Sequence, residues 1–111
     1  MFEHKDKTNI SSLGEFKLID HLTKSFTISK EETVLGIGDD AAIIESKGKY
    51  QLISTDMLIE NIHFDIMYSP LVHIGYKAIS SNISDICAMN ARATQVLVSI
   101  AISSKYTLEA I

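Results

Sequence analysis

Apolar and polar residues follow one another along this chain in blocks whose spacing predicts a helix, short strands and a second helix. The first block has four apolar side chains at helical spacing: Phe16, Ile19, Leu22 and Phe26. We therefore expect a helix that starts near Gly14 and buries this face in a core. Ser12 is its expected N-cap, with Glu15 three residues later as a capping-box partner.

The middle of the chain has the pattern of short strands joined by tight turns. Residues 34–38 predict a strand that runs into a turn, because two glycines there permit unusual backbone angles. Residues 41–45 and 50–54 predict the two strands of a hairpin around the loop Lys47–Lys49. Residues 57–64 have little regular patterning, and we expect an extended or irregular segment.

A second helix is predicted from Ser69 to about Met89. Ser69 supplies a capping hydroxyl and Pro70 suits the first helical position. Asn90 is the expected C-terminal stop, since asparagine tolerates the left-handed conformation.

The last part of the chain predicts a buried strand and the beginning of another helix. Residues 94–102 are β-branched and almost continuously apolar, as in a strand that is covered on both faces. Residues 107–111 open an amphipathic helix. A domain seldom ends within such a helix, so we expect the chain to be a fragment of a longer protein.

Composition narrows the class of protein. The chain has 111 residues, 46% of them hydrophobic and 22% charged, which predicts one domain with a second apolar face for a partner subunit or a missing domain. The net charge is -4 and no Lys/Arg run occurs, which argues against nucleic-acid binding. A single cysteine, Cys87, fits a reducing compartment and is expected to be buried. Neither a signal peptide nor a membrane span is indicated, so we expect a cytoplasmic protein.

Three acidic points could form a site for a hard cation. They are Asp40 after a glycine, the sequence Ser54-Thr55-Asp56 at the end of a strand, and Asp85 on the second helix. Carboxylates and hydroxyls suit magnesium, calcium or manganese rather than zinc. Several carboxylates without compensating cations repel each other, so we expect Mg²⁺ carrying nucleotide phosphates between them.

Each acidic point also has an ordinary structural interpretation. The Asp39–Asp40 pair occurs in many turns, and Asp39 could hold the loop while Asp40 binds the ion. Ser54 and Asp56 could serve a strand exit, and Asp85 could lie on a solvated helix face. His63 could contact a substrate phosphate or ring, although a lone histidine is more often structural. Lys77 could reach a phosphate or be solvated.

Five motifs together resemble the thiamine-monophosphate kinase family. They are Gly14-Glu15-Phe16, the run of residues 36–42 (GIGDDAA), Ile53-Ser54-Thr55-Asp56, His63-Phe64, and residues 76–86 (YKAISSNISDI). Their order and spacing match the amino-terminal half of the family over roughly residues 13–103. In two places the chain departs from the family pattern, with Asn90 where a glycine and Ala93 where a proline is common.

The resemblance implies a fold and an activity. The fold is the α+β, PurM-like amino-terminal domain of the aminoimidazole-ribonucleotide-synthetase-like superfamily, with a mixed β-sheet, helices packed on one face, and sheets that pair into a barrel across a homodimer. The activity is direct ATP- and Mg²⁺-dependent phosphorylation of thiamine monophosphate to thiamine diphosphate. Residues 1–12 would be a mobile segment and 13–111 the ATP/Mg-binding domain.

The resemblance also assigns roles to individual residues. Five residues would coordinate magnesium: Asp40, Ser54, Thr55, Asp56 and Asp85. His63 would contact the thiamine phosphate. The segment alone would be inactive, because further nucleotide contacts of the family lie beyond Ile111. Two other hypotheses remain: another superfamily member such as aminoimidazole ribonucleotide synthetase, or a non-catalytic module for dimerisation or cation binding.

Overall fold

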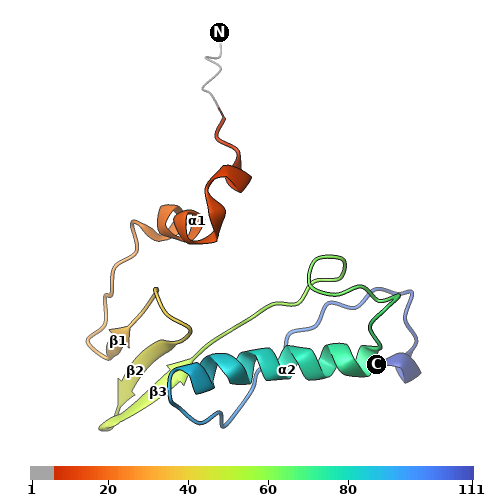
Figure 1. Ribbon diagram of the computed structural model, residues 1–111. Coiled ribbons are helices and arrows are strands. Elements are labelled where there is room, and N and C mark those ends of the chain that lie inside the picture. Colours follow the sequence, from red (N-terminus) through yellow and green to blue (C-terminus); the bar gives the residue numbers. More distant parts are fainter. Residues whose placement is uncertain (1–6) are drawn as a thin grey trace. The chain divides into compact units, whose positions relative to one another are not determined.

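The computed structural model describes residues 7–111, and the chain divides into two units that meet at Lys30 and Glu31. The first unit contains the short 3-10 helix η1 and the helix α1 (Figure 1). The second contains three strands, the long helix α2 and a terminal 3-10 turn η2. The bounds are η1 Ile10–Ser12, α1 Gly14–Thr23, β1 Thr33–Leu35, β2 Ala42–Ser46, β3 Lys49–Ile53, α2 Leu71–Ala88 and η2 Leu108–Ala110. The expected mobile segment 1–12 lies partly outside the described residues, and its last three residues form η1.

Helix α1 begins at the predicted residue but without the predicted cap. Leu13 occupies the N-cap position and makes no side-chain capping bond. The Ser12 hydroxyl instead donates to the carbonyl oxygen of Asn9 at 2.6 Å. The expected capping box with Glu15 is therefore wrong, because Ser12 already belongs to the preceding 3-10 turn.

The apolar face of α1 is exposed within its own unit. Phe16 is 80% and Leu22 is 63% accessible, so the expected burial of this face is wrong. The helix has the predicted amphipathic pattern, but η1, the element that contacts it, has only three residues and is too short to cover the apolar side chains of α1. The spacing of apolar residues was enough to predict the helix. Burial of its apolar face needs a second surface, and residues 7–30 do not provide one.

Strands β2 and β3 form the predicted hairpin. They pair antiparallel from Ala42 opposite Ile53 to Ser46 opposite Lys49. The loop residues Lys47 and Gly48 have φ angles of 52° and 74°. Two successive positive φ values are those of a type I′ turn, whose twist matches that of the flanking strands.

Strand β1 completes a three-stranded sheet of order β1-β2-β3. It pairs antiparallel with β2, with an irregularity between Thr33 and Leu35. An antiparallel sheet with helices agrees with the α+β class. The mixed sheet that we expected is not formed by the described strands, since each of their pairings is antiparallel.

Helix α2 ends as predicted and begins one residue later than predicted. Pro70 is its N-cap rather than its first helical residue, and no side chain caps this end, so the expected Ser69 cap is wrong. At the other end Asn90 adopts φ +56°. The Asn90 N–H donates to Cys87 and the Ala91 N–H donates to Ile86, which is the Schellman pattern of a left-handed helix stop.

Little of the described chain is buried. Ala41 is the one buried apolar residue among residues 7–111, at 3% accessibility. On the sheet, Tyr50 and Ile53 are 67% and 51% accessible, so α2 does not cover the sheet in the way that the expected layer of helices would. Cys87 is exposed, and its predicted burial is wrong.

Residues 94–102 do not form the predicted strand. They have no regular secondary structure and are exposed, with Leu97 at 102% accessibility. A strand needs neighbouring backbone to satisfy its N–H and C=O groups, and none of the described strands pairs with this segment. The helix expected after Thr107 is reduced to the single turn η2. Among the described helices, none combines the length and the apolar character needed to cross a bilayer.

Candidate cation and substrate site

The hydroxyl of Ser54 links the three acidic points that the sequence analysis singled out. Its Oγ donates to the carbonyl oxygen of Asp40 at 2.9 Å and lies 3.4 Å from Oδ2 of Asp85. A hydroxyl has one proton, so the shorter contact is the hydrogen bond and the longer one is a weak second interaction. The structure thus brings the backbone carbonyl of Asp40, the hydroxyl of Ser54 and the carboxylate of Asp85 together, a place that we call the Ser54 junction.

The hairpin explains this arrangement. Because Ala42 pairs with Ile53, the residue before β2 and the residue after β3 lie next to each other at the same end of the sheet. Ala41 is buried at this point, and its small side chain permits close approach. Asp85 belongs to the last turn of α2, so the C-terminal end of that helix meets the exit of β3.

Asp39 and Asp56 each bind neighbouring backbone. Oδ1 of Asp39 accepts the Asp40 N–H at 2.8 Å, which is the loop-holding role considered for this residue. Oδ1 of Asp56 accepts the Met57 N–H at 2.8 Å. Among the described residues, no three His, Cys, Asp or Glu side chains gather closely enough to hold a metal ion. Asp56 is therefore near the Ser54 junction in sequence, but its carboxylate does not complete a three-carboxylate cluster.

The available donors nevertheless have the chemistry of a magnesium site. The junction offers a carboxylate, a hydroxyl and a backbone carbonyl, which are all hard oxygen ligands. Thr55 and Asp56 follow directly and are exposed. Among residues 7–111, Lys105 and Glu60 form the one ion pair. No lysine or arginine in this range therefore neutralises the carboxylates of Asp40, Asp56 and Asp85 through an ion pair. The donor set fits Mg²⁺ in kind, with oxygens that would have to move closer to enclose it.

His63 lies in a loop before α2 and is held by backbone and side-chain contacts. Its Nδ1 accepts the Ile59 N–H at 2.9 Å. Its carbonyl oxygen accepts a hydrogen bond from Nζ of Lys77 at 3.0 Å. Glu60 and Phe64 form an isolated bridge on either side of the turn. Sequence reasoning missed the Lys77 contact, since nothing in the local pattern joins residues fourteen positions apart.

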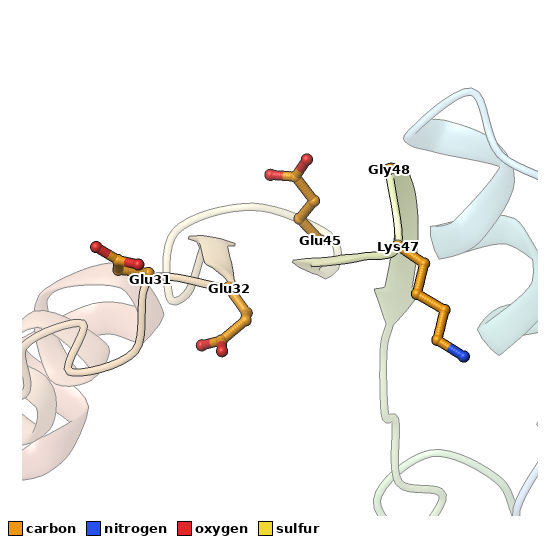
Figure 2. A pocket seen from close by; sticks show the side chains of 5 residues that line it. All are labelled: Glu31, Glu32, Glu45, Lys47 and Gly48. Carbon is orange, nitrogen blue, oxygen red and sulfur yellow. The ribbon is translucent and has the colours of Figure 1, made fainter.

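A shallow hollow elsewhere on the sheet has none of these properties. It has a volume of about 280 Å³ and is lined by Glu31, Glu32, Glu45, Lys47 and Gly48. Figure 2 shows that its three carboxylates point in different directions and that the Lys47 side chain extends away from them. Without converging groups this hollow is not a candidate site.

Comparison with known proteins connects the chain to thiamine-monophosphate kinases. It is 43% identical over 96 residues to the thiamine-monophosphate kinase of Bacillus subtilis (strain 168), covering 86% of this chain and 29% of that protein. The corresponding protein of Mycobacterium tuberculosis (strain ATCC 25618 / H37Rv) is 39% identical, with 84% of this chain and 28% of that protein covered. That of Methanocaldococcus jannaschii is 36% identical, with 84% and 29% covered.

The chain spans less than a third of the length of these relatives. No solved structure matches it significantly. The sequence profile described as "AIR synthase related protein, N-terminal domain" matches residues 38–111, which include every residue of the Ser54 junction and the His63 loop. Because that match covers about two thirds of the chain, the protein belongs to the AIR synthase related family, of which these residues are the N-terminal domain.

Proposed function

We propose that this chain is the amino-terminal part of a kinase that transfers the γ-phosphoryl group of ATP to thiamine monophosphate. The products are thiamine diphosphate and ADP. The observation that carries the cation-binding half of this proposal is the Ser54 hydroxyl, which joins Asp40 and Asp85 at the end of the hairpin. The substrate half is supported by the similarity of the chain to thiamine-monophosphate kinases.

Five residues would hold the magnesium: Asp40, Ser54, Thr55, Asp56 and Asp85. When bound, Mg²⁺ would neutralise the phosphate oxygens of ATP during transfer. The chain's own contribution is to present oxygen ligands from the hairpin and from α2 side by side. The carboxylate of Asp85 lies at the C-terminal end of a helix, where the helix dipole disfavours an anion, and a cation there would relieve that conflict.

His63 would bind the phosphate of thiamine monophosphate. His63 is exposed, its carbonyl oxygen accepts a hydrogen bond from Lys77, and its ring Nδ1 accepts one from the Ile59 N–H. A fixed imidazole can donate a hydrogen bond to a phosphate oxygen without the entropy loss of a mobile side chain. This contact would orient the acceptor substrate.

The protein would act as a cytoplasmic homodimer. The exposed Cys87 fits a reducing compartment. Strands β1 and β3 are the two edges of the sheet, so both have unpaired backbone groups available to a second copy. The exposed apolar segment 94–102 supplies surface that a partner could bury.

The test is an assay of the whole protein with ATP, Mg²⁺ and thiamine monophosphate. We expect thiamine diphosphate to form at the rate at which ADP appears, and to stop when EDTA removes the divalent ion. The family description favours one alternative, an aminoimidazole ribonucleotide synthetase-like activity. ATP turnover with the substrate of that synthetase, and none with thiamine monophosphate, would replace the proposed function with this alternative.

A further inference from the structure

The loop of residues 59–64 is a closed turn with its own hydrogen bonds. The His63 N–H donates to the Ile59 carbonyl at 2.9 Å, and the Asn61 N–H donates to the Phe64 carbonyl at 2.7 Å. Asn61 adopts φ +65°, a left-handed conformation that asparagine tolerates better than most residues. The backbone around His63 is therefore fixed locally.

The hydrogen bond from Ile59 determines which nitrogen of His63 carries the proton. A backbone N–H can only donate, so Nδ1 at 2.9 Å from the Ile59 nitrogen must be the unprotonated acceptor. In a neutral imidazole the proton then resides on Nε2. Nε2 makes no hydrogen bond to any of the described residues, so its N–H is free to donate to a ligand.

Two lysines tie this loop to other parts of the same unit. Nζ of Lys77, on α2, donates to the His63 carbonyl at 3.0 Å. Nζ of Lys105 forms an ion pair with Glu60 at 3.2 Å. The Lys77 contact is to the residue that carries the imidazole, whereas the Lys105 contact is three residues away. Lys77 is thus the stronger determinant of where the ring lies.

From these contacts we infer that Lys77 is a positioning residue, which holds the His63 backbone against α2 so that Nε2 of the ring can donate to the phosphate of the acceptor substrate. The inference rests on the proposed function for the identity of that substrate. In this role Lys77 acts through the His63 carbonyl, to which its ammonium donates, rather than by contact with the substrate. Removing the ammonium would leave the turn closed but free to move relative to α2.

Steady-state kinetics of the whole protein tests the role of Lys77. Lys77→Met should raise the KM for thiamine monophosphate about threefold to tenfold, the range expected for one modest hydrogen bond, and leave the KM for ATP unchanged. Lys77→Arg, which keeps a donor, should restore most of the loss. Lys47→Met is the matched control, because Lys47 is also exposed but lies in the hairpin turn. A KM unchanged in Lys77→Met would overturn the inference.

A double-mutant cycle separates positioning from direct contact with the substrate. If Lys77 acts through the ring, His63→Ala and the combined variant His63→Ala/Lys77→Met should have the same KM. If the two effects add, Lys77 binds the phosphate itself and the inference is wrong.

Nitrogen NMR of His63 provides a readout that does not require activity. In the wild-type protein Nδ1 should have the shift of an unprotonated nitrogen and Nε2 that of a protonated one. Lys77→Met should move or broaden the His63 ring signals, and Lys47→Met should not. A proton on Nδ1, or ring signals unaffected by Lys77→Met, would overturn the inference even if the wild-type enzyme proves to use another substrate. Absence of thiamine diphosphate together with the expected spectra would refute only the proposed function.

Discussion

Replacing Asp85 with asparagine should affect stability and catalysis in opposite directions. Asp85 lies in the last turn of α2, which ends at Ala88, and no ion pair neutralises it among the described residues. Partial negative charge from the helix carbonyls collects at that end, so a carboxylate there is unfavourable by about 0.3–1 kcal/mol. Asparagine keeps an oxygen that can face Ser54, 3.4 Å away in the native chain, and removes the charge.

The expected magnitudes follow from these contacts. Without divalent ions, Asp85→Asn should raise the free energy of unfolding by about 0.3–1 kcal/mol, or the urea midpoint by roughly 0.1–0.5 M. With Mg²⁺ and ATP, the variant should lose about 3 kcal/mol or more of transition-state stabilisation. That loss corresponds to a decrease in kcat/KM of roughly a hundredfold. The added stability that Mg²⁺ confers on the wild-type protein should shrink in parallel.

Urea denaturation with and without Mg²⁺, combined with kinetics at limiting Mg²⁺, measures both effects in the whole protein. Asp20→Asn is the matched control, because Asp20 is an exposed carboxylate in the last turn of α1, which ends at Thr23. It should give the same small gain in stability with no change in the response to Mg²⁺. Two results would refute the reasoning: wild-type kcat/KM in Asp85→Asn at limiting Mg²⁺, or a loss of more than about 1 kcal/mol of stability in metal-free buffer.

Three further predictions concern other parts of the chain. Asp56→Asn should lower kcat/KM roughly a hundredfold at limiting Mg²⁺ and change the urea midpoint little, since asparagine can still accept the Met57 N–H; unchanged kinetics would remove Asp56 from the cation site. Asn90→Val should destabilise the protein by about 1–2 kcal/mol because φ is +56° there, whereas Asn90→Gly should be close to neutral in the same thermal denaturation. The hydrogen bond that Lys105 donates to the Glu60 carboxylate raises the pKa of Lys105 above its ordinary 10.5. The contact therefore contributes fully below pH 10.5 and is lost as the pH rises through the higher folded value, and in an NMR titration Glu60→Gln should lower that pKa.

Features that depend on a few adjacent residues were predictable from the sequence. Gly48 in the hairpin turn and Asn90 at the helix stop have positive φ angles that their residue types tolerate, and both features are where the pattern placed them. The helix caps at Ser12 and Ser69 were wrong by a single residue. A shift of one position removes a capping bond without changing the helix, so caps are the least robust of the local predictions.

Burial was not predictable, because it is a property of the assembled surface rather than of the segment. The apolar face of α1 and residues 94–102 have the composition of core elements, yet both are exposed. A hydrophobic pattern indicates that a face is favourably buried against another apolar surface, but that surface need not lie within the same stretch of chain. The same limit explains why Cys87, in an apolar run, was wrongly expected to be buried.

The candidate site was predictable only in outline. Hairpin pairing places residue 41 opposite residue 54 and so brings the neighbouring Asp40 carbonyl within reach of Ser54, which the strand pattern could suggest. The approach of Asp85 to Ser54 depends on how α2 meets the sheet, and that geometry has no sequence signature. The contacts of His63 with Ile59 and Lys77 were missed because each joins a side chain to backbone, where the residue type of the second partner carries little information.

The exposed run of residues 94–102 has a practical consequence. Its sequence, TQVLVSIAI, contains no charge and no proline, and it is rich in β-branched side chains. Such segments stack between molecules into cross-β fibrils when their backbone is left open. Arg92, two residues before this run, is a charged residue of the kind that slows such stacking, whereas Lys105 after it is paired with Glu60. Low salt, which preserves the electrostatic repulsion between chains of net charge -4, is the condition in which the chain should remain dispersed during purification.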